Sequence, residues 1–270
     1  MRVLLAELSP TRGDLPANLA RIRSVVAGGL ADVAVFPELF LTGYKVGDRI
    51  HQLALRPDGP EWAELTAIAR AANSTVIVGT PIASADRAGE TQNAVVAVGA
   101  GGERFVQVKR YLPTYGPFEE GVHFTPAERS EPTTVAQAPV GLMICYDAFF
   151  PEVGRELAAR GAQLLVAVSA APVTSRRLFD KVLPARAVEN ACPVVYVNRV
   201  GVEDGLVFGG GTGAWDARGE PLALEELPLE PREREEHLYR TEVDLTDAAR
   251  WRPFRPVLRD VASRPSPVAG

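Results

Sequence analysis

The chain is poor in the residues that metal sites and disulfide frameworks need. Its 270 residues include only two cysteines, Cys145 and Cys192, and these do not form a CxxC pair. So few cysteines are typical of a reducing compartment. The three histidines, His51, His123 and His237, are scattered and show no HxxxH spacing. We therefore expect neither a bound metal nor a structural disulfide.

The chain also lacks the features that mark nucleic-acid or membrane partners. It has a net charge of −5 and no Lys/Arg run or basic stripe, so no nucleic-acid partner is indicated. No stretch approaches the roughly 18 apolar residues of a membrane span, and the apolar run near the N-terminus is too short for the core of a signal peptide. We therefore expect a cytoplasmic protein with no membrane contact.

Signatures of nucleotide binding are missing as well. The first expected strand is followed by residues 9–13, Ser-Pro-Thr-Arg-Gly, where a dinucleotide-binding oxidoreductase would carry GxGxxG. Residues 209–211 are three glycines, but they lack the Lys-Ser/Thr ending of a phosphate loop and are better explained as a tight turn. We expect no cofactor.

The chain does contain alternating β-rich and helical segments, in a composition ordinary for a globular protein, 46% hydrophobic and 23% charged. Residue types and turn signals predict strands at 2–8, 32–36, 75–79, 93–98, 104–108, 140–145, 163–169 and 193–198. Helices are expected at 15–27, 61–72, 151–160 and 175–191. Pro184 should kink the last of these helices or begin a new one.

The order of these elements favours an α/β protein with mixed sheets. Strands outnumber helices, and a glycine-rich segment joins 93–98 to 104–108 as in a hairpin, so a purely parallel sheet is not expected. Helices packed outside mixed sheets fit the pattern better. No internal repeat or linker is visible. We expect one domain over residues 1–249, followed by a Pro- and Arg-rich arm or tail, 250–270.

Cys145 is the first candidate for chemistry. It ends the apolar run 140–144 and precedes a helix expected to begin near Pro151. A cysteine at such a strand-to-helix junction lies at a sharp turn, where nearby backbone N–H groups can hold a developing oxyanion. The alternative is a buried structural cysteine. A nucleophilic thiol needs a base, and none of the histidines stands in a recognisable pairing context, so a carboxylate base is the other option.

Glu38 and Lys109 are the groups that could activate a thiol. Glu38 follows residues 33–37, which should be buried, and a carboxylate there is costly unless it is paired or functional. Lys109 ends the strand 104–108. Taken alone, Glu38 can be an ordinary loop carboxylate and Lys109 a solvated strand-end lysine.

Taken together, these three segments resemble the nitrilase superfamily of carbon–nitrogen hydrolases. The motifs are Phe-Pro-Glu-Leu around Glu38, Lys109 ahead of Leu-Pro, and Cys-Tyr-Asp at Cys145 followed by Phe-Pro-Glu. Their order and separations also match. Further counterparts lie at 160–163, 185–190, 197–201 and 208–212, so the resemblance covers nearly the whole chain. Each motif is weak alone, but the ordered set is highly specific.

The resemblance implies a fold and a mechanism. The family fold is a four-layer αββα sandwich of two mixed β-sheets, and members commonly dimerise through the helix after the cysteine or build larger homo-oligomers. Glu38 would be the general base, Cys145 the nucleophile, and Lys109 with the Tyr146 N–H the oxyanion stabiliser. A thioester would form and be hydrolysed. A cation and a carboxylate beside a thiol suit this chemistry.

Many members carry a second glutamate between the lysine and the cysteine. Here Glu119 and Glu120 both lie in that segment. Residues 111–120 resemble the glutaminase domain of glutamine-dependent NAD synthetase, where this glutamate falls two residues after a phenylalanine. That register selects Glu120 as the fourth catalytic residue and leaves Glu119 as the alternative.

The residues after the cysteine bear on the reaction. Nitrilases usually have Trp-Glu there, whereas Tyr146-Asp147 resembles amidases and carbamoyl hydrolases. A small-molecule amide is therefore the expected substrate. The alternatives are a nitrile, an N-carbamoyl compound, or glutamine hydrolysed to supply ammonia to a partner synthetase. A non-enzymatic alternative is a silent oligomeric scaffold, but a scaffold would not need Glu38, Lys109 and Cys145 together.

Five further side chains are candidates for substrate contacts. Tyr44 follows Glu38 by six residues and could line the pocket. Phe149, Phe150, Ser169 and Ala170 should lie near the cysteine, on either side of the helix that follows it. Each could instead be a packing residue.

Overall fold

Two β-sheets stack face to face in the computed structural model, which describes residues 1–85, 87–232 and 235–263. The larger sheet has the strand order β13-β14-β1-β2-β3-β4-β5. Its strands are β1 (Arg2–Glu7), β2 (Val33–Val35), β3 (Thr75–Ala83), β4 (Thr91–Val98), β5 (Arg104–Val108), β13 (Glu225–Leu227) and β14 (His237–Glu242). Within it, β1, β2 and β3 pair in parallel and the remaining strands pair antiparallel.

The second sheet has five strands in the order β12-β9-β8-β7-β6. They are β6 (Thr133–Val135), β7 (Ala138–Ile144), β8 (Leu164–Ser169), β9 (Val194–Asn198) and β12 (Gly213–Trp215). The strands β7, β8 and β9 are parallel, and both edge strands run antiparallel to them. A separate hairpin consists of β10 (Val200–Glu203) and β11 (Leu206–Gly209). The prediction of mixed sheets is confirmed.

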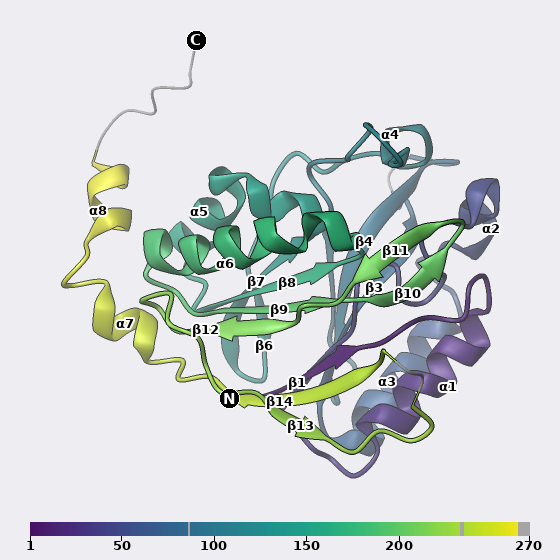
Figure 1. The fold of residues 1–270 in the computed structure, drawn as a ribbon, viewed down its shortest axis with the longest axis horizontal. Helices are drawn as coiled ribbons and strands as arrows, with labels where there is room; N and C mark the ends of the chain where they lie inside the picture. Colours follow the sequence, from purple (N-terminus) through teal and green to yellow (C-terminus); the bar gives the residue numbers. More distant parts are fainter. Residues whose placement is uncertain (86, 233–234, 264–270) are drawn as a thin grey trace.

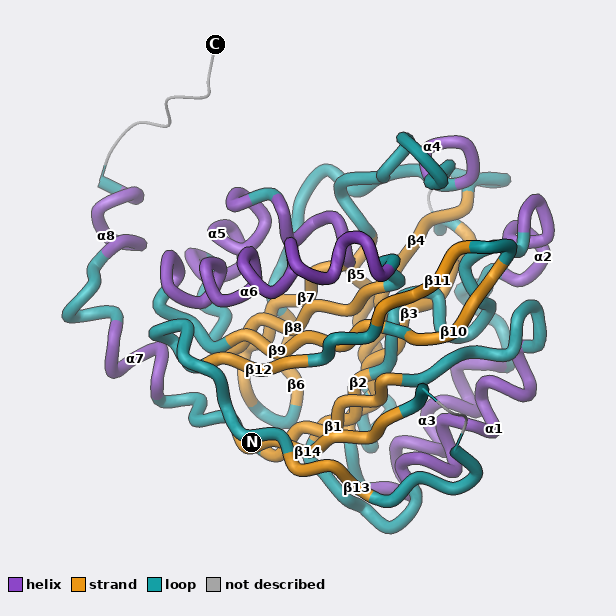
Figure 2. The backbone as a smooth tube through the Cα atoms, in the orientation of Figure 1, coloured by secondary structure: helices purple, strands orange, loops and turns teal. Residues whose placement is uncertain are grey.

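Helices cover the outer face of each sheet, which completes the four-layer αββα sandwich (Figure 1). The helices α1 (Leu15–Val26) and α3 (Glu61–Ala72) cover the larger sheet, and α5 (Pro151–Ala159) and α6 (Arg176–Asn190) cover the smaller one (Figure 2). The shorter helices are α2 (Ile50–Leu53), α4 (Glu120–His123), α7 (Asp247–Trp251) and α8 (Val257–Ala262). Single 3-10 turns occupy Gly47–Arg49, Cys145–Phe149 and Val173–Ser175.

The alternation of side chains along the strands divides the core into three layers. In β7, Leu142 and Ile144 face the larger sheet, whereas Met143 faces α5 and α6. Val35 and Ile77 lie opposite them in the same inter-sheet core. Because the strands are apolar on both faces, they read as continuous hydrophobic runs in the sequence. This central layer fixes how the ends of the two sheets face each other.

The helix α6 and the C-terminal segment differ from what the sequence predicts. The helix α6 does not restart at Pro184 but runs through it, because residues on either side, such as Phe179 and Ala187, continue one buried face. At the C-terminus, α7 spans the expected boundary at 249/250. The segment after it is tied down by Arg252 and Arg255, whose guanidinium groups donate to backbone carbonyls 2.6 Å away. Residues 264–270 of the expected tail lie outside the described residues.

The lengths and hydropathies of the helices can be compared with those of a membrane span. Within the ranges that the structure describes, no helix is both long and apolar enough to cross a membrane.

Candidate active site

Cys145 lies at the sharp turn that the sequence predicts. It follows β7 directly and begins the 3-10 turn that leads into α5. Its φ of +48° is in the left-handed region, which a residue with a side chain adopts only when its surroundings hold it there. The Asp147 carboxylate supplies part of that hold, since it accepts the Ile144 N–H at 3.2 Å. It also accepts the N–H groups of Arg110 and Tyr111 at 3.1 and 3.0 Å. One carboxylate thus ties the cysteine turn to the segment after Lys109.

Glu38 and Lys109 form a fully buried ion pair. Each follows the end of a strand of the larger sheet, β2 and β5 respectively, and both side chains are 0% exposed. Lys109 Nζ lies 2.6 Å from Glu38 Oε1 and 2.8 Å from Glu120 Oε1. The single ammonium group therefore bridges two carboxyl groups. A buried cation with two such partners is held in one place, as a catalytic group must be.

The two neighbouring glutamates, Glu119 and Glu120, differ in burial and in their contacts. Glu120 is 3% exposed and contacts Lys109, whereas the Glu119 side chain is 69% exposed. Glu119 lies only within 4.0 Å of the Lys45 ammonium group, at the surface. The structure therefore brings Glu120, and not Glu119, into the cluster with Glu38 and Lys109.

Burial and mutual charge shift the ionisation of this cluster. Burial raises the pKa of Glu120 to about 7, against the attraction of the Lys109 ammonium group. Burial alone would lower the pKa of Lys109, but the carboxylates of Glu120 and Glu38 outweigh it, so the pKa is raised and the lysine stays charged. Burial and the Glu38 carboxylate together raise the pKa of the Cys145 thiol, with Lys109 opposing them. The raised pKa favours the protonated form of the thiol.

Asn93 is a member of the cluster that the sequence did not reveal. Its side chain is completely buried in β4, and Nδ2 donates to Glu38 Oε1 at 2.8 Å and to Glu120 Oε2 at 3.2 Å. The available signal was a polar residue in a strand that is otherwise apolar from 94 to 98. The side-chain oxygen of Asn93 is buried and has no hydrogen-bond partner in the part of the chain that the structure describes.

The residues after β8 complete the wall of the site. The Ala170 N–H donates to Glu38 Oε2 at 2.8 Å, so this predicted site residue contacts Glu38 directly. Ser169 is fully buried, and the parallel register that pairs Ile144 with Val168 puts it beside Cys145. Its hydroxyl interacts electrostatically with the Cys145 thiol but makes no hydrogen bond of normal geometry.

The expected aromatic residues divide between the site and its surroundings. Tyr44 donates its O–H to Glu120 Oε1 at 2.7 Å, so it belongs to the cluster. Tyr146 meets the exposed ring of Tyr115 edge-on at 5.5 Å. Phe149 instead turns toward α6, with its ring 4.9 Å from that of Phe179, and joins the packing under the helices. No contact of the Tyr146 N–H bears on its expected role at an oxyanion, which stays a prediction.

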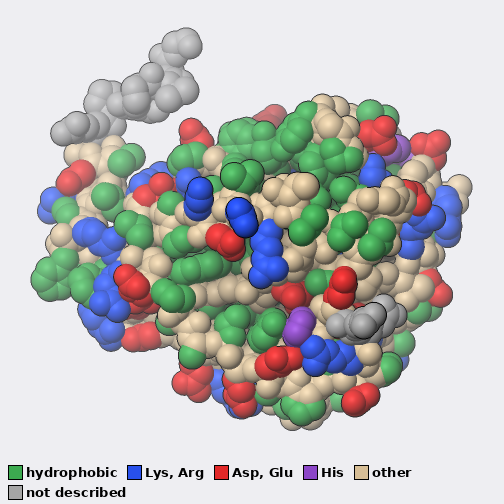
Figure 3. All heavy atoms as spheres, in the orientation of Figure 1, with side chains coloured by type: hydrophobic (Ala, Val, Ile, Leu, Met, Phe, Trp, Pro, Cys, Tyr) green, Lys and Arg blue, Asp and Glu red, His purple; other side chains and the backbone are tan. Residues whose placement is uncertain are grey.

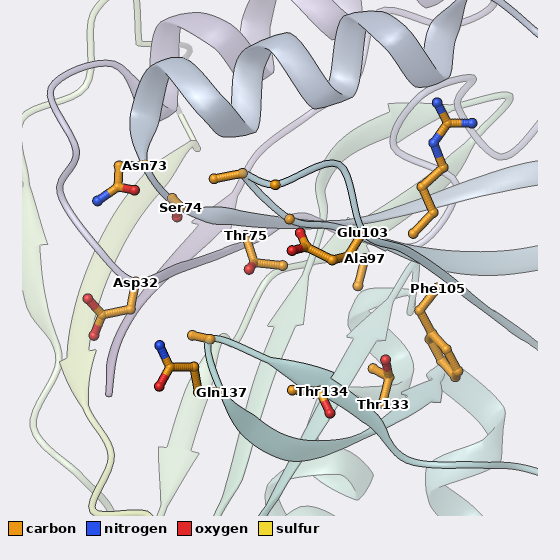
Figure 4. Close-up of a pocket in the computed structure, with 15 residues that line it drawn as sticks. Asp32, Asn73, Ser74, Thr75, Ala97, Glu103, Phe105, Thr133, Thr134 and Gln137 are labelled. Atoms are coloured by element: carbon orange, nitrogen blue, oxygen red, sulfur yellow. The ribbon is translucent and has the colours of Figure 1, made fainter.

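Two cavities show where ligands have room. One of about 540 Å³ borders the cluster, with Tyr44 and Glu120 in its wall beside Lys45 and His123. A larger one of about 750 Å³ (Figure 4) is lined by residues such as Thr75 and Gln137, at the end of the sandwich where β3 and β7 begin. It opens between residues 73–75 and the β6–β7 turn, which precedes β7, while Cys145 follows β7. The larger cavity therefore takes no part in the chemistry of Cys145.

Fold and site together define a hydrolase of carbon–nitrogen bonds, and comparison with known families agrees. A family model described as carbon-nitrogen hydrolase matches residues 2–253. The chain belongs to this family, within the nitrilase superfamily.

Several similar proteins have a more specific description than the family model. An (R)-stereoselective amidase from a Pseudomonas species is 32% identical over 82% of this chain and 80% of its own length. The glutamine-dependent NAD(+) synthetase of Thermotoga maritima is 32% identical over 99% of this chain, which spans only 46% of that relative. Among solved structures, the amidase of Nesterenkonia AN1 superposes with a TM-score of 0.78 at 29% identity, covering 96% of this chain and 93% of its own.

Within the described residues, no group of three His, Cys, Asp or Glu side chains is placed to hold a metal ion. The expectation that the enzyme needs neither a metal nor a cofactor stays a prediction.

Proposed function

We propose that the protein is an amidase that hydrolyses a small amide through Cys145, Glu38 and Lys109, with Glu120 as a fourth catalytic residue. The observation that carries this proposal is the buried cluster in which Lys109 bridges the two glutamates beside a protonated thiol. A thiol whose pKa is raised cannot attack as a preformed thiolate. It therefore needs a carboxylate that accepts its proton as it attacks.

In the first half-reaction the thiol proton passes to the Glu38 carboxylate as sulfur bonds to the amide carbon. The carbonyl oxygen becomes an oxyanion, which the Lys109 ammonium group and the Tyr146 N–H stabilise. The oxyanion then collapses and the C–N bond breaks. The leaving nitrogen takes the proton from Glu38, so ammonia or an amine departs and a thioester remains on Cys145.

In the second half-reaction water gives its proton to Glu38 and attacks the thioester carbon. The second tetrahedral oxyanion is held by the same donors. When it collapses the C–S bond breaks, the sulfur recovers the proton from Glu38, and the carboxylic acid leaves. In each half-reaction Glu38 takes up one proton and gives it back, so no reactant besides the amide and water is needed.

Amide substrates are favoured over nitriles for two reasons. The Tyr146-Asp147 pair after the cysteine resembles amidases, and Asp147 has a structural task here in holding the cysteine turn. The relatives also include an (R)-stereoselective amidase. In the structure of a Glu-to-Gln mutant of the Nesterenkonia amidase, the acetamide moiety of fluoroacetamide is added covalently at the active-site cysteine. Glutamine hydrolysis is the second candidate, since the chain is similar to part of glutamine-dependent NAD(+) synthetases.

The test is ammonia release from short aliphatic amides, ω-amides of dicarboxylic acids, glutamine, N-carbamoyl amino acids and nitriles, with Cys145→Ala run beside the wild type. We expect release from one amide class that depends on Cys145 and a mass increase on Cys145 when a slow substrate is trapped. Release from nitriles alone would replace the amidase proposal with a nitrilase. Equal release by wild type and Cys145→Ala would exclude Cys145 as the nucleophile.

We also propose that the protein forms a homodimer or larger homo-oligomer through its α5–α6 layer. In the space-filling view, hydrophobic side chains lie over this layer among charged ones (Figure 3). Leu178 and Val188 of α6 are 51% and 40% exposed, and Phe254 after α7 is 76% exposed. Light scattering coupled to gel filtration tests the proposal. We expect at least twice the 29.0 kDa of one chain for wild type and a smaller mass for Leu178→Glu.

A further inference from the structure

A buried ion pair outside the proposed catalytic set lies at the β10–β11 hairpin. Glu203 ends β10 and is 5% exposed, although the neighbouring Val202 is 61% exposed. Arg199 Nη1 lies 2.5 Å from Glu203 Oε1, and the Arg199 guanidinium group stacks 4.0 Å from the centre of the Phe208 ring. Burying two charges is costly, so this pair calls for a reason beyond hairpin stability.

The second oxygen of Glu203 holds the backbone of a distant turn. Glu203 Oε2 accepts the Tyr44 N–H at 2.9 Å and the Lys45 N–H at 2.7 Å. The chain can approach this closely because residue 43 is a glycine with φ +80°. A Cβ there would lie 2.9 Å from Glu203 Oε1. The carboxylate thus fixes the turn that carries Tyr44.

The same hairpin also fixes the ring of Tyr44. Phe208 of β11 meets the Tyr44 ring edge-on, with centroids 6.0 Å apart. The Tyr44 hydroxyl then donates to Glu120 Oε1 at 2.7 Å. Figure 1 shows the β10–β11 hairpin at the same end of the sandwich as α4, which begins with Glu120. A continuous set of contacts therefore runs from Arg199 and Glu203 through Tyr44 to Glu120.

We propose that Glu203, held by Arg199, is a positioning residue for Glu120 and acts through Tyr44. This inference rests on the catalytic role proposed for Glu120. The hairpin contributes no group to the reacting atoms. Its part is to keep the Tyr44 hydroxyl on the Glu120 carboxylate, so that Glu120 is oriented and ionised when substrate arrives.

Several groups face Glu120. The Tyr44 hydroxyl is one of the groups that favour the charged form of Glu120. Lys109 and Tyr44 lower the pKa of Glu120, and Glu38 raises it. The side-chain amide of Asn93 and the Cys145 thiol also face Glu120. Loss of the Tyr44 hydrogen bond should therefore raise the pKa of Glu120 above about 7. A displaced Tyr44 side chain would raise the pKa of Glu120 as a missing Tyr44 hydroxyl would. The proposal can therefore be tested by measuring that pKa in variants.

The experiment follows alkylation of Cys145 by iodoacetamide as a function of pH, with mass spectrometry as the readout. Because no amide turnover is needed, it remains informative if the substrate is not the one proposed. Glu120→Gln identifies the inflection that belongs to Glu120, since that variant should lack it. We expect Tyr44→Phe and Glu203→Ala to move the inflection upward by about 0.5 pH unit or more. The double variant should show no further shift, because both changes remove the same hydrogen bond.

Two further variants separate positioning from general damage. Glu236→Gln is the matched control, since Glu236 is also a buried carboxylate that pairs with an arginine (Arg21, 2.7 Å) and accepts a backbone N–H (Ser9, 3.0 Å). It should leave the inflection in place. Arg199→Met combined with Glu203→Gln removes the buried charges but keeps an acceptor for the Tyr44 N–H, so it should restore much of the wild-type profile. The proposal is wrong if Glu203→Ala folds and its inflection coincides with that of the wild type.

Discussion

Glu38 Oε2 accepts the N–H of Ala170 at 2.8 Å, and this hydrogen bond joins two sheets. Glu38 follows β2 of the larger sheet, whereas Ala170 follows β8 of the smaller one. The other proposed catalytic groups are divided in the same way, with Lys109 after β5 and Cys145 after β7. The distance between Glu38 and Cys145 is therefore set by the packing of the inter-sheet core.

Lys109→Met should abolish amide hydrolysis and lower stability together. The variant leaves Glu38 and Glu120 facing each other in a buried site without their cation. Breaking a buried pair in this way costs about 3–5 kcal/mol of unfolding free energy. Urea denaturation measures the loss. Lys45→Met is the control for stability, since its pair with Glu119 is near the surface and should contribute about 0–1 kcal/mol. A Lys109 variant as stable as the control would contradict this reasoning.

Glu120→Gln and Glu119→Gln form a matched pair of neighbours. Glu120 contacts Lys109 at 2.8 Å and should lose at least about 100-fold in kcat when its charge is removed. Glu119 is exposed and should keep kcat within about twofold of wild type. Steady-state kinetics on one amide tests both. The reverse ranking would show that the lysine segment adopts another register in the working enzyme.

Activity should fall as pH decreases through about 7, because Glu120 then becomes protonated and no longer pairs as an anion with Lys109. Stability should change in the opposite sense. The pKa of Glu120 is about 7 in the folded state and near 4.5 without the fold, so the folded protein binds more protons between these values. The free energy of unfolding contributed by Glu120 is therefore present below about pH 4.5 and is lost as pH rises through 7.

The difference between wild type and Glu120→Gln isolates this contribution. Urea denaturation at several pH values gives each curve, and subtraction removes the groups that both proteins share. We expect the wild type to lose stability relative to the variant between about pH 4.5 and 7. A difference that is flat over that interval would show that Glu120 titrates normally in the folded state.

Gly79→Ala should damage the site through the backbone of Glu38. A Cβ at residue 79 would lie 2.4 Å from the Glu38 Cα and 2.5 Å from the Leu39 nitrogen, so the strand end must move. We expect at least about 100-fold loss of kcat/KM. Gly28→Ala is the comparison, since nothing lies within 4 Å of its Cβ and only its φ of +91° is unfavourable, at a cost of about 1 kcal/mol. Similar losses in both would point to general destabilisation.

Much of this architecture is predictable from sequence, and the exceptions have physical causes. Most of the long strands and the helix over 61–72 carry clear residue patterns, and the family motifs mark Glu38, Lys109 and Cys145. The six-residue strand β14 (His237–Glu242) was not predicted. The short strands β6, β10, β11, β12 and β13 span only three or four residues each, too few to show a period.

The supporting residues of the site were missed for a different reason. Asn93, Asp147 and Glu203 each contact segments that lie 27 to 159 residues away in the chain. Nothing in the local sequence around such a residue reveals its partner. Their roles become visible only once the two sheets and the hairpin are packed together.

The charge balance of the cluster has a consequence for turnover. Two carboxyl groups share one ammonium group below the surface, so the ionised cluster carries a surplus of negative charge. An amide is neutral and enters without electrostatic opposition, but its hydrolysis product is a carboxylate at neutral pH. Under the proposed amidase mechanism, the cluster that accepts the neutral amide therefore repels the carboxylate product. This difference in charge between substrate and product should keep product inhibition weak and favour release of the product after each turnover.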